Sequence, residues 1–240
     1  MERYPLTAKY DEKWISDNWM GPHPLWLLED ICRHMDIQPG MKVLDMGCGK
    51  GLTSVFLARE FGVTVFANDL WIRATDNLHR FEAAGVAGKV FPIHAEAHEL
   101  PYAEGFFDVA ISIDSYQYYG TCDTYFPAVF HKLVKPGGQY GIVVPGLKEE
   151  LENGCPETLK EFWEPEMYTF HSKEWWRNHW EKTGLVAVSA LYEIDEPKAH
   201  WYPWAHWAKA NLQFNDKEFL DADVNGDLAL IAMVARRGTA

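Results

Sequence analysis

The sequence lacks several features that would indicate particular classes of protein. It has only four cysteines in 240 residues, with no Cys-x-x-Cys pair and no Cys/His spacing typical of a metal site. These cysteines predict reduced thiols in a cytoplasmic protein rather than a disulfide framework. No apolar run approaches the ~18 residues that a membrane span needs, and no apolar stretch follows the charges near the N-terminus. Neither secretion nor membrane insertion is therefore indicated.

Positive charge is also scarce. The chain has 22 Lys and Arg against 35 Asp and Glu, which gives a net charge of −13. A surface of this sign repels phosphate polyanions, so no nucleic-acid partner is expected. No internal repeat, low-complexity tract or linker is evident, and no group of Asp, Glu, His or Cys has a metal-ligand spacing. The length suits one domain over residues 1–240, as a monomer or a homodimer.

The most informative stretch is Lys42-Val-Leu-Asp-Met-Gly-Cys-Gly-Lys-Gly51. It predicts a short buried strand that leads into a glycine-rich turn, with a helix beginning at Leu52. The glycines remove β-carbons that would keep a ligand away from the backbone, and the helix start presents unpaired N–H groups. The stretch therefore predicts a site for a nucleotide-type cofactor, and the context must decide which one.

Strands and helices alternate after this turn. Strands are expected at residues 43–46, 63–68, 90–94, 107–113 and 139–144, with helices at 52–60 and 71–84. Short apolar strands separated by helical segments predict βαβ crossovers and a parallel sheet covered on both faces. Beyond Gly146 a helix is expected at 172–180 and strands at 185–191 and 227–235, while the aromatic segment 198–214 has no obvious period.

The second predicted strand ends at Asn68-Asp69, about twenty residues beyond the glycines. An acidic side chain at this place can accept hydrogen bonds from ribose hydroxyls, which favours a bound adenosine. The alternative is a solvated Asp69 that caps the following helix.

Together these motifs resemble class I S-adenosylmethionine-dependent methyltransferases of the ubiquinone-biosynthesis-like, small-molecule type. The resemblance covers about residues 40–145. It rests on the order and spacing of Val43-Leu-Asp-Met-Gly-Cys-Gly-Lys-Gly51, Asp69, Ala95-Glu-Ala-His-Glu-Leu-Pro-Tyr102, Phe107-Asp108 and Leu133-Val-Lys-Pro-Gly-Gly138. Asp45 favours this family over dinucleotide-binding enzymes, which usually have an apolar residue there.

The resemblance implies an α/β fold with a Rossmann-like, seven-stranded sheet. Its strand order would be 3-2-1-4-5-7-6, with strand 7 antiparallel and helices on both faces. Residues 40–145 would form the cofactor-binding core, and residues 146–227 a substrate-side elaboration rich in Trp. Residues 1–22 would form an N-terminal arm, which resembles the lid that many such enzymes close over the cofactor. An ordinary packing strap is the competing account of this arm.

The resemblance also places the cofactor, S-adenosylmethionine, on individual residues. The methionine portion would be wrapped by Asp45, Gly47, Cys48, Gly49 and Gly51. Asp69 would hold the ribose, and Leu70 and Trp71 would flank the adenine. Glu96 and Ala97 would lie against the adenine amino edge, although Ala95-Glu96 replaces the family's usual Gly-Asp. Ile113 would lie at the carboxyl edge of the sheet, where ligands of open α/β folds bind.

The loop after the fourth strand is the predicted site of catalysis. Methyl transfer requires an acceptor that is desolvated, aligned and relieved of its proton. Asp114 would either anchor a cationic amine or act as the base. Enzymes resembling phosphoethanolamine methyltransferases have His four residues after this Asp, where this chain has Tyr118. Capping of the next helix, or binding of the cofactor amino group, explains Asp114 equally well. His171 is the best-placed spare histidine to reach a pocket.

Aromatic residues are the remaining candidates for substrate binding. The predicted set is Tyr10, Trp19, Tyr119, Trp175, Trp201 and Trp204. Such rings could form a cage for an ammonium group, because a cation over an aromatic face gains ~0.5–2 kcal/mol. They could equally form a stacking wall for a planar substrate, or fill the core of an irregular insertion.

The predicted function is methyl transfer to a small molecule, with nitrogen favoured as the acceptor atom. This preference rests on Asp114 and on the excess of aromatic residues. An oxygen acceptor on an aromatic or carboxylic substrate, a thiol acceptor, and a cofactor-binding module without turnover are the alternatives.

Overall fold

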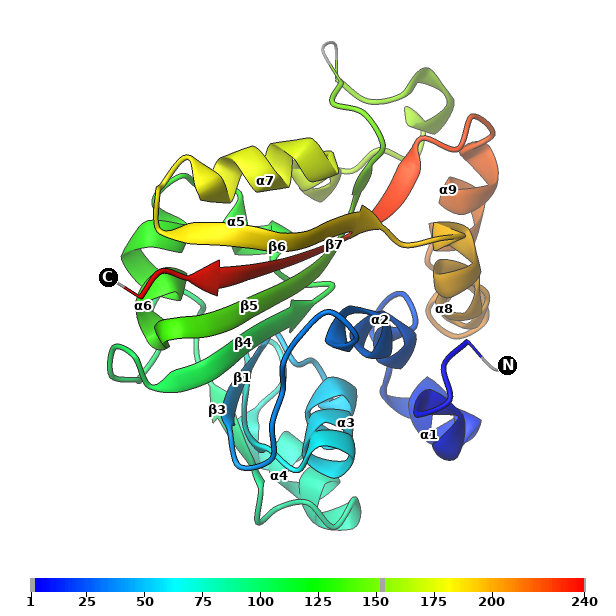
Figure 1. Ribbon diagram of the computed structural model, residues 1–240. Helices are drawn as coiled ribbons and strands as arrows, with labels where there is room; N and C mark the ends of the chain where they lie inside the picture. The colour runs from blue at the N-terminus through cyan, green and yellow to red at the C-terminus, as the bar shows by residue number, and fades with distance from the viewer. Residues whose placement is uncertain (1–2, 152–153, 240) are drawn as a thin grey trace.

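The computed structural model describes residues 3–151 and 154–239, which form a seven-stranded sheet between two layers of helices (Figure 1). The strands are β1 (Lys42–Met46), β2 (Thr64–Asp69), β3 (Val90–His94), β4 (Phe107–Ile113), β5 (Val134–Leu147), β6 (Val186–Glu193) and β7 (Leu228–Arg237). Their order is β3-β2-β1-β4-β5-β7-β6, and β7 pairs antiparallel with both of its neighbours. The predicted fold class, strand order and antiparallel strand are confirmed.

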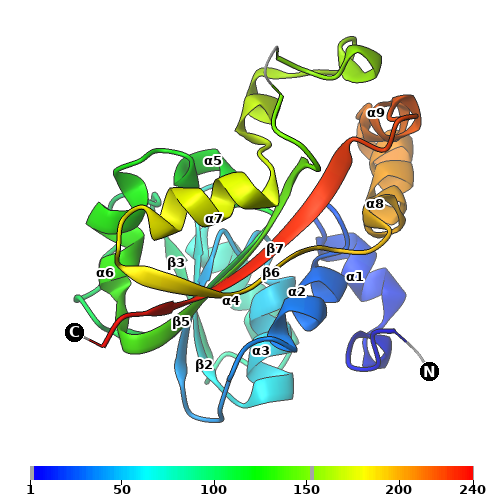
Figure 2. The ribbon, with the colours of Figure 1, turned by 45° about the horizontal axis from the view of Figure 1, so that its top comes forward.

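Helices cover both faces of the sheet (Figures 1 and 2). They are α1 (Glu12–Asn18), α2 (Pro24–Cys32), α3 (Leu52–Phe61), α4 (Ala74–Ala83), α5 (Gln117–Gly120), α6 (His131–Leu133), α7 (Lys173–Glu181), α8 (Pro197–Leu212) and α9 (Asp216–Ala222). The sequence sets several of their starts. Pro24 lies in the first turn of α2, and the Ser172 side chain accepts a hydrogen bond from the backbone N–H of Trp175 at the start of α7.

Alternate residues of the strands divide the core between the two faces. In β4, Val109 and Ile111 belong to the core beneath α2 and α3, while Ala110 belongs to the core on the opposite face. That second core is dominated by rings, with Trp176 and Trp180 of α7 completely buried. These two tryptophans are structural parts of the aromatic C-terminal half.

The aromatic segment that showed no obvious period forms the helix α8. Its buried residues, Trp201, Trp204, Ala205 and Ala208, do follow helical spacing. The period was obscured because Tyr202 and Trp207, on other sides of the helix, are also aromatic and half-buried. Both sides are occupied because α8 packs against the sheet and α9 as well as against the N-terminal arm, where Trp207 meets the ring of Trp19.

The N-terminal arm is fastened to the body of the protein. The buried Glu29 carboxylate accepts hydrogen bonds from the backbone N–H groups of Leu6 (3.0 Å) and Thr7 (2.7 Å) and from the Thr7 hydroxyl (2.7 Å). Tyr10 donates to Glu60 of α3 at 3.1 Å. These contacts hold residues 6–10 closely, and movement of the arm as a lid stays a prediction.

The described part of the chain has no helix that is long and apolar enough to cross a membrane. All four cysteines are free thiols.

Candidate active site

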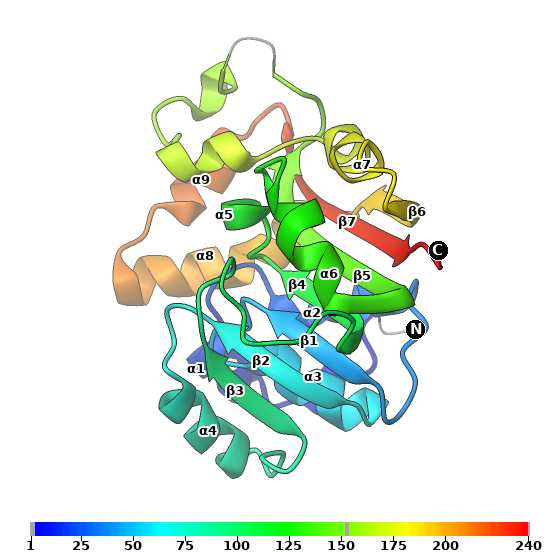
Figure 3. The same ribbon diagram turned by 90° about the vertical axis from the view of Figure 1, so that its left-hand side faces the viewer.

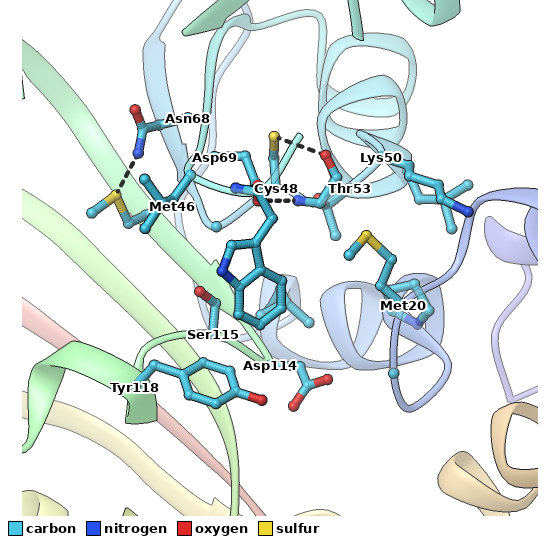
Figure 4. A pocket seen from close by; sticks show the side chains of 18 of the residues that line it. Met20, Met46, Cys48, Lys50, Thr53, Asn68, Asp69, Asp114, Ser115 and Tyr118 are labelled. Carbon is cyan, nitrogen blue, oxygen red and sulfur yellow. Dashed lines mark hydrogen bonds between the residues drawn. The ribbon is translucent and has the colours of Figure 1, made fainter. Parts of the chain in front are cut away.

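A cleft of about 1000 Å³ lies at the carboxyl ends of β1, β2 and β4 (Figure 4). At one end it is lined by the turn after β1 and by the ends of β2 and β3, which we call the glycine-turn end. At the other end it is lined by residues 18–22 of the arm, by Pro24, and by residues 113–115, 118 and 119, which we call the Asp114 end. The carboxyl edge of an open α/β sheet is where ligands of such folds bind.

The glycine-rich turn is tied to the neighbouring strand. The backbone N–H groups of Gly47 and Cys48 donate to the carbonyl oxygen of Asn68 at 2.8 and 3.0 Å. Gly47 has a φ of +72°, and a β-carbon there would lie 1.9 Å from the Ser115 hydroxyl oxygen. A side chain at this position would therefore collide with the loop after β4. Glycine allows the turn after β1 and the loop after β4 to lie this close to one another.

Asp69 connects the end of β2 to the glycine-rich turn. One carboxylate oxygen accepts from the backbone N–H of Gly49 at 2.8 Å, and the other accepts from the N–H groups of Trp71 (2.7 Å) and Ile72 (2.8 Å). Asp69 also lines the cleft. The two interpretations drawn from the sequence are thus not exclusive, because this side chain organises the following loop and faces the cleft as well.

Two of the predicted cofactor residues lie behind the cleft wall. Asp45 is buried, and one of its oxygens accepts from the hydroxyls of Thr53 (2.7 Å) and Ser54 (2.5 Å) at the start of α3. Burial raises the pKa of Asp45 to about 6, and the two hydroxyl hydrogen bonds act in the opposite direction. Gly51 packs against Phe81, whose ring would lie 2.3 Å from an added β-carbon.

The other predicted cofactor residues line the cleft directly. They are Gly47, Cys48, Gly49, Asp69, Leu70, Trp71, Glu96, Ala97 and Ile113. Leu70 and Trp71 are 52% and 69% exposed, which is unusual for large apolar side chains. Trp71 lies 5.8 Å from the ring of Tyr118 across the rim, so the cleft opens between apolar surfaces of the kind that ligands cover.

Asp114 presents a carboxyl group to the cleft from an uncommon backbone conformation. Its φ is +53°, and its N–H donates to the carbonyl oxygen of Val143 at 2.7 Å. Burial, and then the negative charge of Asp216, raise the pKa of Asp114 to about 8. The Gln117 amide lies 3.4 Å from it, and Asp114 forms no ion pair within residues 3–151 and 154–239.

The arm and α5 close the Asp114 end. A β-carbon on Gly21 would lie 2.0 Å from a carboxyl oxygen of Asp114, so the arm touches this side chain. In Figure 4, Asp114 and the Tyr118 hydroxyl point toward one another, across the cleft from Asp69 and Cys48. Trp19 also lines the cleft. The Asp114 end is therefore an anionic group among aromatic rings.

Tyr119 lies between the two ends of the cleft. Its hydroxyl is 3.1 Å from the Ser112 hydroxyl and 3.3 Å from that of Ser115. The cleft is also lined by Ser115, Gly21 and Met20, which no pattern in the sequence indicated as site residues. Gly21-Pro-His-Pro24 is a helix-start pattern in the sequence, and only the folded arm reveals its contact with Asp114.

Five of the predicted catalytic and substrate-binding residues do not line the cleft, namely Tyr10, His171, Trp175, Trp201 and Trp204. His171 is hydrogen-bonded to Glu150 (3.1 Å) and stacked on Trp175 at 3.6 Å between ring centroids. Tyr10 packs on Phe56. Trp201 is a buried residue of α8, and no residue of α8 lines the cleft. The predicted roles of these residues remain without support from the geometry.

Trp204 also lies outside the cleft, but it contacts Asp216, a residue that the sequence patterns did not indicate. The indole N–H groups of Trp201 and Trp204 both donate to one carboxylate oxygen of Asp216, each at 3.2 Å. Trp204 in turn meets Trp19 edge to face at 6.4 Å. Asp216 is thereby fixed beside the Asp114 end. Within the residues that the structure describes, no group of three His, Cys, Asp or Glu side chains is placed to hold a metal ion.

Comparison with known proteins agrees with this geometry. A family model described as a methyltransferase domain matches residues 43–138. The sterol 24-C-methyltransferase of Yarrowia lipolytica is 27% identical over 124 residues, which are 51% of this chain and 32% of the relative. Phosphoethanolamine N-methyltransferase 3 of Arabidopsis thaliana is 33% identical over 131 residues, which are 53% of this chain and 26% of the relative. The chain spans a third or less of the length of these two relatives.

Solved structures share the fold over most of the chain. Phosphoethanolamine N-methyltransferase 2 of Haemonchus contortus, bound to phosphomonomethylethanolamine and S-adenosylhomocysteine, has a TM-score of 0.71 at 20% identity, over 100% of this chain and 61% of that one. Geranyl diphosphate C-methyltransferase of Streptomyces coelicolor has a TM-score of 0.70 at 16% identity, over 90% of this chain and 78% of that one. The [4+2]-cyclase SpnF has a TM-score of 0.71 at 16% identity, over 89% of this chain and 81% of that one. At these identities the likeness shows the fold alone.

Proposed function

Because the chain belongs to the class I S-adenosylmethionine-dependent methyltransferases, we propose that it transfers the methyl group of S-adenosylmethionine to a small amine. Family membership confirms the predicted class of enzyme and its cofactor. The acceptor is the part of the proposal that rests on this chain's own residues. The relatives named for their reactions methylate carbon or nitrogen, so their names leave the acceptor atom open.

The glycine-turn end fits the cofactor. Gly47 and Gly49 leave the backbone bare where a ligand would approach, and Asp69 offers carboxylate oxygens at the place where a ribose is expected. The exposed side chains of Leu70 and Trp71 supply an apolar rim for a flat ring such as adenine. When bound, the cofactor supplies a methyl group on a positively charged sulfur.

The observation that carries the amine assignment is the unpaired carboxyl group of Asp114 among aromatic rings. Trp19, Tyr118 and Tyr119 line the cleft near it, and no positive side chain pairs with it in the described part of the chain. A buried carboxylate without a partner is costly, and an ammonium group would supply the missing positive charge. The rings favour the same ligand through their electron-rich faces.

Asp114 would also take the proton that must leave the acceptor. An ammonium ion has no lone pair, so it must lose a proton before its nitrogen forms the new N–C bond as the S–C bond breaks. A carboxyl group whose pKa lies at about 8 is ionised only at and above this pH, and its ionised form is basic enough to accept that proton. The aligned backbone of this loop, fixed by the hydrogen bond to Val143, holds the carboxyl group in place.

Carbon is the second candidate acceptor, because relatives include C-methyltransferases of sterols. An alkene that takes a methyl group becomes a carbocation, and an anionic, aromatic surrounding would stabilise that charge as well. Phenolate and thiolate acceptors are less compatible with the cleft, because Asp114 and Asp216 would repel them. A cofactor-binding protein without methyl transfer is the remaining alternative.

The proposal is tested by incubating the protein with methyl-labelled S-adenosylmethionine and a panel of amines, phenols, thiols and prenyl alkenes. We expect labelled methyl on nitrogen, identified by mass spectrometry. Label on carbon would transfer the assignment to the second candidate, and absence of label on every member would contradict methyl transfer to these classes. The predicted monomer or homodimer, the cytoplasmic location and the division into arm, core and Trp-rich elaboration are retained as part of the proposal.

A further inference from the structure

The cap formed by α8 and α9 brings a second carboxylate to the Asp114 end. Asp216 is the first residue of α9, and one of its oxygens receives both indole N–H groups of Trp201 and Trp204. Two donors on one oxygen fix the orientation of a side chain that lies, half-buried, at a helix start. The other oxygen forms no hydrogen bond within the described residues and is left for a different partner.

Several contacts place Asp216 near the acceptor rather than on an unrelated surface. Trp204, which holds it, meets Trp19 edge to face, and Trp19 lines the cleft. Burial is the largest cause of the raised pKa of Asp114 and of Tyr118, and the negative charge of Asp216 adds to the rise in both. Figure 3 shows α8 and α9, which pack against one another, next to each other in the fold.

We propose that Asp216 is the second carboxylate of the acceptor site: it draws positively charged amines into the cleft and assists their deprotonation by acting through Asp114. This inference rests on the proposed methylation of an amine. It makes Asp216 a positioning residue that determines specificity for cationic over neutral or anionic acceptors.

The charges around Asp114 support this role. Asp216 faces it from α9, Tyr118 faces it from α5, and Glu166 acts on Tyr118 from the turn before α7. The arm residues that line the cleft, 18–22 and Pro24, carry no charge. Lys50 is the only Lys or Arg among the residues that line the cleft, and it lies at the glycine-turn end, where its ammonium group donates to the carbonyl oxygen of Asp17 at 3.2 Å. Among the residues that the structure describes, the Asp114 end thus has one carboxyl group in the cleft, a second behind its aromatic wall, and no Lys or Arg in its lining.

The proton balance follows from these positions. The acceptor enters as an ammonium ion, attracted by both carboxylates. Its proton passes to the Asp114 carboxylate, and its nitrogen then forms the N–C bond while the S–C bond breaks. The electron pair of the broken bond stays on sulfur, which becomes a neutral thioether, and the product leaves as a methylated amine. The negative charge of Asp216 makes Asp114 a better acceptor for that proton.

The test compares D216N with D221N, a matched control on the same helix. Asp221 is also a carboxylate that accepts from an aromatic residue, the Tyr202 hydroxyl (2.9 Å), and from Lys217 (2.5 Å). Unlike the half-buried Asp216 it is exposed, and its charge does not act on Asp114 or Tyr118. Asn at position 216 keeps an oxygen for the two indole donors. The readout is the pH profile of kcat/KM with whichever amine the acceptor panel identifies.

We expect D216N to lower kcat/KM for the cationic amine roughly 10-fold on the plateau above the acid limb, and to move that limb roughly one unit to lower pH. The direction follows because Asp114 must be ionised to act, and removal of a neighbouring negative charge lowers its pKa. D216E should restore most of the activity, and D221N should stay within about twofold of the wild type. Carboxyl 13C NMR of the cofactor-free protein, with Asp114 assigned from D114N, should show the same shift.

The outcomes separate this inference from the proposed function. If the wild type methylates amines and D216N leaves the acid limb in place, or if D221N moves it equally, the role of Asp216 is wrong and the amine assignment stands. If the wild type methylates no amine, the proposed function fails first and this inference falls with it.

Discussion

The two ends of the cleft are built from the chain in different ways. The glycine-turn end comes from loops that follow the neighbouring parallel strands β1, β2 and β3, all within residues 46–97. The Asp114 end joins residues 18–22 and Pro24 to the loop after β4, and it receives Asp216 through indoles of α8. The glycine-turn end thus comes from one continuous part of the sequence, whereas the Asp114 end is assembled from segments that are far apart in the sequence.

This difference has a functional consequence. Backbone groups make most of the glycine-turn end, where Asp69 is engaged by three N–H groups. Side chains make the Asp114 end, where a carboxyl group has no cationic partner within the described residues. The first arrangement suits a ligand that is the same throughout the family, and the second can vary with the acceptor.

The largest expected effect is the loss of activity in D114N. Asn is tolerated at positive φ, so this substitution removes the charge and keeps the backbone conformation of the loop. Because the proposed role of Asp114 is both to attract the amine and to take its proton, we expect the rate of methyl transfer to an amine to fall about 10²–10⁴-fold. Initial rates with the identified amine measure this. A variant that keeps more than half of the wild-type rate would remove Asp114 from the chemistry.

D114N is expected to have a smaller effect on stability, and this effect is a gain: the free energy of unfolding rises although activity falls. The pKa of Asp114 rises from 3.8 to about 8 on folding, so the folded protein holds a proton that the unfolded chain releases. The wild type therefore loses stability as the pH rises from about 4 to 8, and D114N does not have this loss. After allowance for partial solvent exposure, the gain in unfolding free energy at pH 9 is on the order of 2–4 kcal/mol.

Urea unfolding of the cofactor-free proteins measures this gain. The two curves of stability against pH should converge below pH 4, where Asp114 is protonated in both states. An equal difference at pH 4 and pH 9 would mean that the substitution acts through packing and not through charge.

The smallest of these effects is expected from G21A. The new methyl group would lie 2.0 Å from an Asp114 oxygen, so the carboxyl group must move away from the arm. We expect a fall of roughly 10-fold in kcat/KM for the amine, because catalysis depends on placement. Affinity for S-adenosylhomocysteine should be unchanged. G88A is the matched control, since nothing lies within 4 Å of the added methyl there. Equal effects of the two substitutions would contradict the contact between the arm and Asp114.

The same comparison explains what the sequence could predict. The sheet order followed from a strand–turn–helix pattern and from a resemblance tied to it. The same pattern placed the predicted cofactor residues from Gly47 to Trp71, and Asp114, along one cleft, because adjacent parallel strands bring their carboxyl ends to one edge. The positions of Asp45 and Gly51 behind the wall required side-chain geometry that a motif does not contain.

The missed residues have a common cause. Gly21 and Asp216 belong to segments whose local patterns describe helix boundaries, and their contacts depend on how those helices pack in three dimensions. The aromatic residues were recognised as candidates, but spacing alone did not separate Trp19, which lines the cleft, from Trp175, which stacks on His171. Long-range packing decided these cases.

The most direct test of the division between the two ends is calorimetric binding of S-adenosylhomocysteine to D69N and D114N, measured side by side. The Asn amide of D69N would face backbone N–H groups, so we expect affinity to fall about 10- to 100-fold. D114N should bind within about twofold of the wild type, because Asp114 serves the acceptor. Unchanged binding by D69N, or an equal loss in both variants, would contradict the account.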